Sequence, residues 1–157
     1  MIMGYPGSTD RYLASSAIAH SFKNSNPLIV KILGDRLSIM KKFMDADPKV
    51  RIMLASNYAS LANTHKYFEG QNLGLERNNV IQDRKEMEAK FMQWVNADPA
   101  RKSKYGSVLE VIRKNYESNA DVLKLQSYMN MAGFGPGFVQ YGIGFWRLSR
   151  TMEAKPD

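Results

Sequence analysis

Three polar residues near the start of the sequence are of the types that a hydrolase uses. Ser8, Asp10 and His20 could supply a nucleophile, an orienting acid and a base. A triad is assembled by the fold rather than by nearness in sequence, and nothing around Ser8 resembles the sharp turn that exposes a nucleophilic serine. We therefore interpret these side chains as turn residues and expect no catalytic residue in this chain.

Metal ligands and phosphate loops are the next candidates for chemistry. The two histidines, His20 and His65, are isolated, no helix offers a HExxH-type pair, and the sequence has no cysteine. The stretch "GFGPG" at 133–137 looks like a phosphate-binding loop, but Pro136 has no amide N–H and no Lys-Ser or Lys-Thr pair follows. We expect neither a metal nor another cofactor.

One further stretch, "ANTHKYFEGQNLGL" at 62–75, gathers polar and aromatic side chains, including Asn63, His65 and Lys66. It could be a binding patch, or it could be the end of a helix that stops at Gly70. Residue types and spacing alone leave both interpretations open.

Charge and hydropathy indicate whether nucleic acid or a membrane is a partner of this chain. The chain has 157 residues and a formal net charge of +7, but in "QDRKEMEAK" at 82–90 acids and bases alternate at helical spacing, as on a solvated helix. We expect no nucleic-acid partner. No window is long and apolar enough for a membrane span, and residues 1–12 lack the features of a signal peptide, so we expect a soluble chain.

The elements that must position these residues are mainly helices. Three times the sequence places a capping residue before a proline, at Asn26–Pro27, Asp47–Pro48 and Asp98–Pro99, a pattern typical of a helix start. With the apolar periodicity, the pattern predicts helices over about 27–45, 48–69, 75–97 and 107–129. The predicted fold class is all-α, a bundle of long antiparallel helices joined by short turns.

The remaining segments are less regular. Ile2 and Met3, followed by "GYPGS", predict a short N-terminal strand remnant, which would need a partner strand. The small residues Ala55, Ala59 and Ala62 favour a second helix that is buried on more than one face. Trp94 and the methionines are expected in the core. The glycine-rich segment 133–144 could be a loop or a weak helix.

Four segments, taken in order, resemble the bacterial dipeptidyl-peptidase 7 and dipeptidyl-peptidase 11 family of serine exopeptidases. They are "MGYPGSTDRYLAS", "LSIMKKFMDADPKVRI", "ASNYASLANTHKYFEGQNLGL" and "EMEAKFMQWVNADPARKSKYGSVL". The resemblance runs from Met1 to about Leu125 and preserves the turns as well as the helices. It implies a chymotrypsin-like double β-barrel with a large helical domain inserted as a cap over the active site.

The resemblance also implies where this chain belongs in such an enzyme. Residues 1–24 would be the end of a barrel strand and the loop that leads from it, and residues 25–157 would be part of the helical cap domain. The family's catalytic histidine and aspartate, and its "GNSGSP"-type serine motif, have no counterpart here. We therefore expect a fragment without a triad, which is inactive alone. The whole enzyme would be periplasmic or at the cell surface, would form a homodimer, and would release dipeptides from peptide substrates with a free N-terminus.

In this family an asparagine from the helical domain helps bind the substrate N-terminus, and Asn63 is the matching residue. His65 stands where the family has an aromatic residue, and Leu33 stands where a basic residue is usual, so the cap surface differs in detail. His65 and Lys66 are expected to be structural or rim residues. The alternative is a stand-alone helical binding module without catalytic activity.

Overall fold

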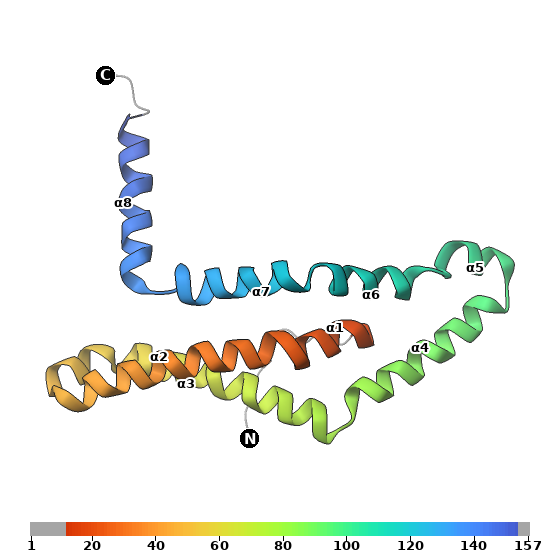
Figure 1. The fold of residues 1–157 in the computed structure, drawn as a ribbon, viewed down its shortest axis with the longest axis horizontal. Helices are drawn as coiled ribbons and strands as arrows, with labels where there is room; N and C mark the ends of the chain where they lie inside the picture. The colour runs from red at the N-terminus through yellow and green to blue at the C-terminus, as the bar shows by residue number, and fades with distance from the viewer. Residues whose placement is uncertain (1–11, 154–157) are drawn as a thin grey trace, which may run out of the picture.

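The computed structural model describes residues 12–153, and within that range it contains helices and no strand (Figure 1). The predicted all-α class is confirmed, whereas the predicted strand at Ile2 and Met3 lies outside the described residues. In chain order the elements are α1 Ser15–His20, the π-helical turn η1 Ser21–Ser25, α2 Asn26–Ala46, α3 Pro48–Arg77, α4 Val80–Asn96, α5 Pro99–Tyr105, α6 Val108–Ser118, α7 Ala120–Tyr128, the π-helical turn η2 Met129–Gly133, and α8 Gly137–Glu153.

Helices α2 and α3 form an antiparallel hairpin, whose turn lies at the left-hand end of the molecule in Figure 1. The chain reverses at Asp47, whose backbone is extended at φ −142°. Its carboxylate accepts a hydrogen bond from the Lys49 N–H at 2.7 Å, and Pro48 opens α3. This satisfies one of the N–H groups that a helix start leaves without a partner. The predicted cap is confirmed.

The corner between α4 and α5 has the same aspartate cap followed by a proline. Asp98 has φ −144° and accepts a hydrogen bond from the Arg101 N–H at 2.9 Å, and Pro99 is the first residue of α5. Both corners follow from three or four neighbouring residues, which is why the sequence predicts them correctly.

The predicted helix over about 27–45 is confirmed as α2, but the predicted cap at Asn26 is wrong, because the chain is already helical before that residue. The helix begins eleven residues earlier, at Ser15, and passes through η1 into α2, so the stretch expected as a loop up to residue 24 is helical from Ser15 onward. In the π-turn the Asn26 N–H bonds to the carbonyl of Ser21, five residues back. In the same register the Phe22 carbonyl would need the N–H that Pro27 lacks.

A side chain from α3 supplies the missing donor. Asn72 donates from Nδ2 to the Phe22 carbonyl at 3.2 Å. Asn26, only 2% exposed, donates from its own Nδ2 to Asn72 Oδ1 at 2.7 Å and to Gln71 Oε1 at 2.8 Å. We call Asn26, Gln71 and Asn72 the amide cluster. Buried polar groups need such partners, and this cluster joins the π-turn to α3.

The amide cluster lies beyond the point where α3 was predicted to end. The helix continues through Gly70 to Arg77, so the predicted end at residue 69 and the next start at residue 75 are both wrong. The turn falls instead at Asn78 and Asn79. Asn79 has φ 50°, in the left-handed region that asparagine tolerates better than most residues.

A small apolar core lies where α1, α2 and α4 meet their neighbours. Its buried hydrophobic residues among those described are Ala17, Ile18, Ile32, Leu33 and Val95. The start of α1 is fixed by α4, because the Ser15 N–H and Oγ donate to the two carboxylate oxygens of Glu88, each at 2.6 Å. Helix α2 meets α3 at Gly34, where a Cβ would be in ordinary van der Waals contact with the His65 ring, 3.4 Å from Nε2.

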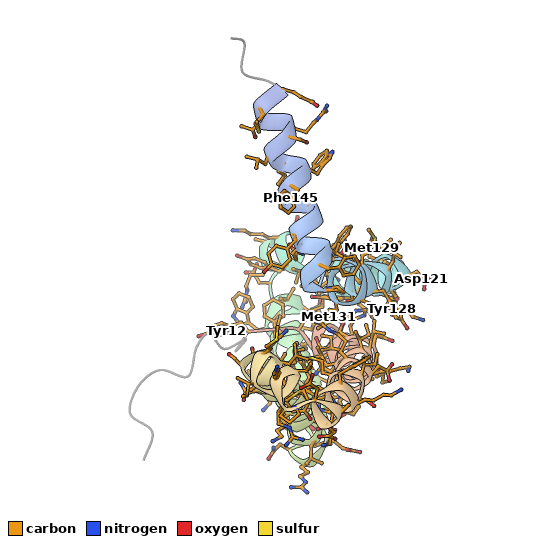
Figure 2. All side chains as sticks on the ribbon, turned by 90° about the vertical axis from the view of Figure 1, so that its left-hand side faces the viewer. Tyr12, Asp121, Tyr128, Met129, Met131 and Phe145 are labelled. Atoms are coloured by element: carbon orange, nitrogen blue, oxygen red, sulfur yellow. The ribbon has the colours of Figure 1, made fainter. Side chains whose placement is uncertain are left out.

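Helices α6 and α7 form a nearly straight rod that runs alongside α1 and α2 (Figure 1). The single helix predicted from residue 107 is interrupted at Asn119, the cap between α6 and α7. At the far end of the rod, Arg36 of α2 donates from Nη1 to the carbonyl of Met131 at 3.3 Å. Figure 2 shows Met131 between the rod and the hairpin.

The glycine-rich tail becomes helix α8, which stands at a steep angle to the rod (Figure 1). Its side chains, including Phe145 at 71% exposed, project away from the other helices (Figure 2).

The predicted burial of Trp94 and the methionines is wrong in part. Trp94 is 50% exposed, and several methionines are exposed too, namely Met53, Met87, Met129 and Met152. No helix within residues 12–153 is both long and apolar enough to cross a lipid bilayer.

Candidate functional site

Asn63 lies on the face of α3 that points away from α2. Residues spaced three or four apart share one side of a helix, and the residues that share the side of Asn63 are all exposed. They are Ser56, Ala59, Ser60, Asn63, Lys66, Tyr67 and Gly70. We call this set the outer face of α3. The opposite side, with Leu54, Leu61 and His65, is half-buried.

The Asn63 side chain ends in a polar amide group. It is exposed and makes no hydrogen bond with any residue in the described range 12–153. An amide offers one oxygen acceptor and two N–H donors. One turn further along, Tyr67 is 59% exposed, and its hydroxyl accepts a long hydrogen bond of 3.4 Å from Gln71 Nε2.

Small residues border Asn63 on this face. Ala59, Ser60 and Gly70 have little or no side chain, so another chain can approach the helix closely there. The predicted burial of α3 on a second side is not observed, because Ala55 and Ala59 are exposed among the described residues. The outer face of α3 is thus a surface with a polar group at its centre and few bulky neighbours.

His65 has a structural position. Its Nδ1 lies 3.3 Å from Glu69 Oε2, its side chain is 20% exposed, and its ring lies against Gly34 at the crossing with α2. Lys66, on the outer face, is exposed and makes no ion pair with a described residue. His65 is thus a packing residue at the helix crossing, whereas Lys66 is exposed to solvent.

The other candidates for chemistry are not brought together. His20 Nδ1 lies 3.3 Å from Asn24 Nδ2, and its ring lies 5.3 Å from that of Tyr116. Ser8 and Asp10 lie outside the described residues. Within residues 12–153 no three His, Asp or Glu side chains are grouped as a metal ion would require.

The pKa shifts in the described structure belong to exposed ion pairs. A hydrogen bond from Lys41 lowers the pKa of Asp45, and the same bond raises the pKa of Lys41. A hydrogen bond from Lys114 likewise lowers the pKa of Glu110. Both are pairs four residues apart on a helix, at 2.8 Å, and such pairs stabilise a helix surface rather than tune a catalytic group.

The described residues therefore form a helical domain, and the outer face of α3 is exposed along its length. Asn63 and Lys66 on this face have no hydrogen-bond or ion-pair partner within residues 12–153, and no nucleophile with a paired base lies beside them in that range. The chain belongs to the Peptidase S46 family, which matches residues 1–157.

Individual relatives agree with this membership. The chain is 33% identical to the dipeptidyl-peptidase 7 of Porphyromonas gingivalis over 157 residues, which are all of this chain and 22% of that protein. It is 32% identical to the dipeptidyl-peptidase 7 of Phocaeicola vulgatus over 98% of this chain and 21% of that protein. It is 34% identical to an Asp/Glu-specific dipeptidyl-peptidase of Flavobacterium psychrophilum over 83% of this chain and 18% of that protein. The chain thus spans about a fifth of the length of these relatives.

The amide cluster is the feature that sequence reasoning missed. One signal could have revealed it, because a proline within a helical pattern leaves a carbonyl that needs another donor. Pro27 is such a residue. The donor, Asn72, lies 50 residues from the Phe22 carbonyl that it serves, so its identity could not be read from the pattern.

Proposed function

We propose that this chain is the helical cap of a serine dipeptidyl peptidase. Residues 25–157 would form part of the cap that covers the active site, and residues 1–24 would include the end of a barrel strand. Membership of the Peptidase S46 family over the whole chain supports the proposal. The all-α structure and the names of the relatives also support it.

Within this cap, we propose that Asn63 binds the substrate's N-terminus. An enzyme that removes dipeptides must hold the α-ammonium about two extended residues, or roughly 7 Å, from the bond that it cleaves. An amide oxygen can accept a hydrogen bond from that ammonium. The observation that carries the proposal is the exposed Asn63 amide, which has no hydrogen-bond partner in the described structure and small residues beside it.

The proposal is tested in the full-length enzyme with substrates that carry a free N-terminus. Asn63→Ala removes an acceptor from a charged donor, which costs about 1.5 to 3 kcal/mol. We expect kcat/KM to fall by roughly tenfold to a hundredfold. Asn63→Asp keeps the oxygen and adds a charge, so it should retain most of the activity that Asn63→Ala loses.

The control variant is Asn57→Ala. Asn57 is an exposed asparagine on the same helix, about a third of a turn away from Asn63 around the helix axis. It should leave both kcat/KM and the melting temperature nearly unchanged. Unchanged kcat/KM in Asn63→Ala, or an equal loss in Asn57→Ala, would remove Asn63 from the binding site.

We further propose that the longer protein is periplasmic or on the cell surface, takes peptide substrates with a free N-terminus and forms a homodimer. Light scattering on the full-length enzyme checks the last point. The alternative, a stand-alone helical binding module, predicts a gene without barrel sequence around this segment. A "GNSGSP"-type serine motif downstream of Asp157 in the same reading frame would exclude the alternative.

A further inference from the structure

A groove runs between the first helical segment of the described chain and the rod. It consists of two adjoining cavities, of about 520 and 270 Å³, which share His20, Lys23, Asn24 and Ala120 in their walls. The larger cavity falls within the usual size range for a ligand pocket. We call the two cavities together the seam groove.

Basic residues are distributed along the seam groove rather than gathered at one point. Lys85 of α4 lines only the larger cavity, Lys124 of α7 lines only the smaller one, and Lys23 of η1 lines both. None of these three lysines makes an ion pair with a described residue. They leave three positive charges along the groove that no described carboxylate neutralises.

The acidic residues in the same walls do not cancel this charge. Glu117 is already paired, because Arg113 donates from Nη1 to both of its carboxylate oxygens at 2.8 Å. Asp121 is the other acidic residue, and it lines only the smaller cavity. The larger cavity therefore carries a clear excess of positive charge.

The floor of the groove is partly apolar. Ala19, Ile81 and Tyr116 line the larger cavity and Leu28 lines the smaller one, and all four are half-buried. An apolar floor with lysines along it suits a ligand that has both apolar surface and several negative charges. A compact ion such as phosphate would leave the apolar floor uncovered.

We propose that the seam groove binds an acidic peptide segment in an extended conformation. An extended chain places alternate side chains on the same side about 7 Å apart, so successive carboxylates can meet successive lysines while the intervening residues cover the floor. The proposal goes beyond the dipeptidyl-peptidase role and does not depend on Asn63 or on catalysis.

Direct binding to the 157-residue chain tests the proposal. The probe is a fluorescein-labelled peptide of three Glu-Ala repeats, blocked at both ends, and the matched probe replaces each glutamate by glutamine. We expect fluorescence anisotropy at low salt to show at least about tenfold weaker binding of the glutamine peptide. Binding of the acidic peptide should weaken further as salt is raised, because salt screens exposed charges.

Matched variants separate a specific groove from general positive charge. Lys23→Gln, Lys85→Gln and Lys124→Gln should each weaken binding by about two- to fivefold, as expected for exposed charge pairs. The control variants Lys42→Gln, Lys49→Gln and Lys90→Gln remove the same charge from exposed lysines that do not line the groove. They should change the affinity by less than about 1.5-fold, and circular dichroism confirms that each variant remains helical.

Three results would overturn the proposal. They are equal binding of the glutamine peptide, equal losses in the control variants, and absence of binding by the acidic peptide. Sodium decanoate serves as a competing amphiphilic anion with a single charge. If decanoate binds and the acidic peptide does not, the groove is a site for a different class of ligand and the peptide assignment is wrong.

Discussion

The hairpin and helix α8 carry similar apolar stripes but differ in how much of them is covered. In α2, Leu33 is 1% exposed because α3 lies against it, whereas Leu148 of α8 is 55% exposed. The apolar spacing predicts a helix over about 27–45, whereas the glycine-rich segment 133–144 at the start of α8 could be a loop or a weak helix. Burial depends on a second surface, which the hairpin finds within the described chain and α8 does not.

Polar contacts differ in the same way. The hairpin holds the amide cluster, whose bonds join residues 45 to 50 positions apart. The side-chain bonds of α8 are local, such as Ser149 to the carbonyl of Trp146 and Thr151 to that of Arg147. A 17-residue helix with only local bonds is marginally stable in water. Its aromatic side chains remain exposed because no described element packs against them.

The largest expected difference between the two regions concerns core truncation. Leu33→Ala should lower the free energy of unfolding by about 2 to 5 kcal/mol, because it removes buried methyl groups and leaves a cavity. Leu148→Ala, the matched change in α8, should alter it by less than about 0.5 kcal/mol. Urea titration followed by circular dichroism at 222 nm measures both.

The comparison between the regions fails if the two leucine variants lose similar stability. A large loss for Leu148→Ala would mean that α8 is packed in solution. A loss below about 1 kcal/mol for Leu33→Ala would mean that the hairpin tolerates or refills the cavity.

A smaller effect is expected from the amide cluster. Asn72→Leu removes the donor to the Phe22 carbonyl and the acceptor for Asn26, so two buried polar groups lose a partner. The free energy of unfolding should fall by about 1 to 3 kcal/mol. Amide exchange should also become faster around Ser21–Ser25. Asn57→Leu, at an exposed position on α3, should do neither.

The smallest expected effect lies at the tip of the hairpin. Lys41→Met removes the hydrogen bond that holds the pKa of Asp45 below its ordinary value of 3.8, so that pKa should rise toward 3.8. Because the folded-state pKa is lowered, the pair stabilises the fold above the ordinary pKa and loses its effect as the pH falls below it. A titration followed by NMR measures the shift. Lys42→Met, next to the pair, should leave the pKa of Asp45 unchanged.

The sequence predicted local features well and distant ones poorly. Asp47 and Asp98 cap helices whose first N–H groups lie two or three residues away, so type and order were sufficient. Pro27 was expected to follow a non-helical segment, and Gly70 was expected to end a helix. Both instead lie inside helices, because the contacts of the amide cluster outweigh their intrinsic preferences.

The candidate site shows the same difference between local features, which the sequence predicts, and distant contacts, which it does not. The resemblance to relatives singled out Asn63, and the sequence pattern could not show that its amide would be exposed and unbonded. The pattern also placed Trp94 in the core. In the structure its ring stacks with that of Phe91 at 6.0 Å and lies beneath the Arg101 guanidinium at 4.4 Å, at a corner where solvent reaches one side. Apolar periodicity predicts which side of a helix is apolar. It does not predict at which residues another element packs against that side.

The π-turn at Ser21–Ser25 has a consequence for how insertions and deletions are accepted in this region. A π-turn contains one residue more than the α-helical turn that it replaces. Deleting one residue there would restore regular helix and rotate α1 by about 100° against α2, which would carry Ser15 away from Glu88 and leave Asn72 without the Phe22 carbonyl. Homologues that are one residue shorter at this point should therefore lack Pro27 and differ together at the positions of Ser15, Asn72 and Glu88.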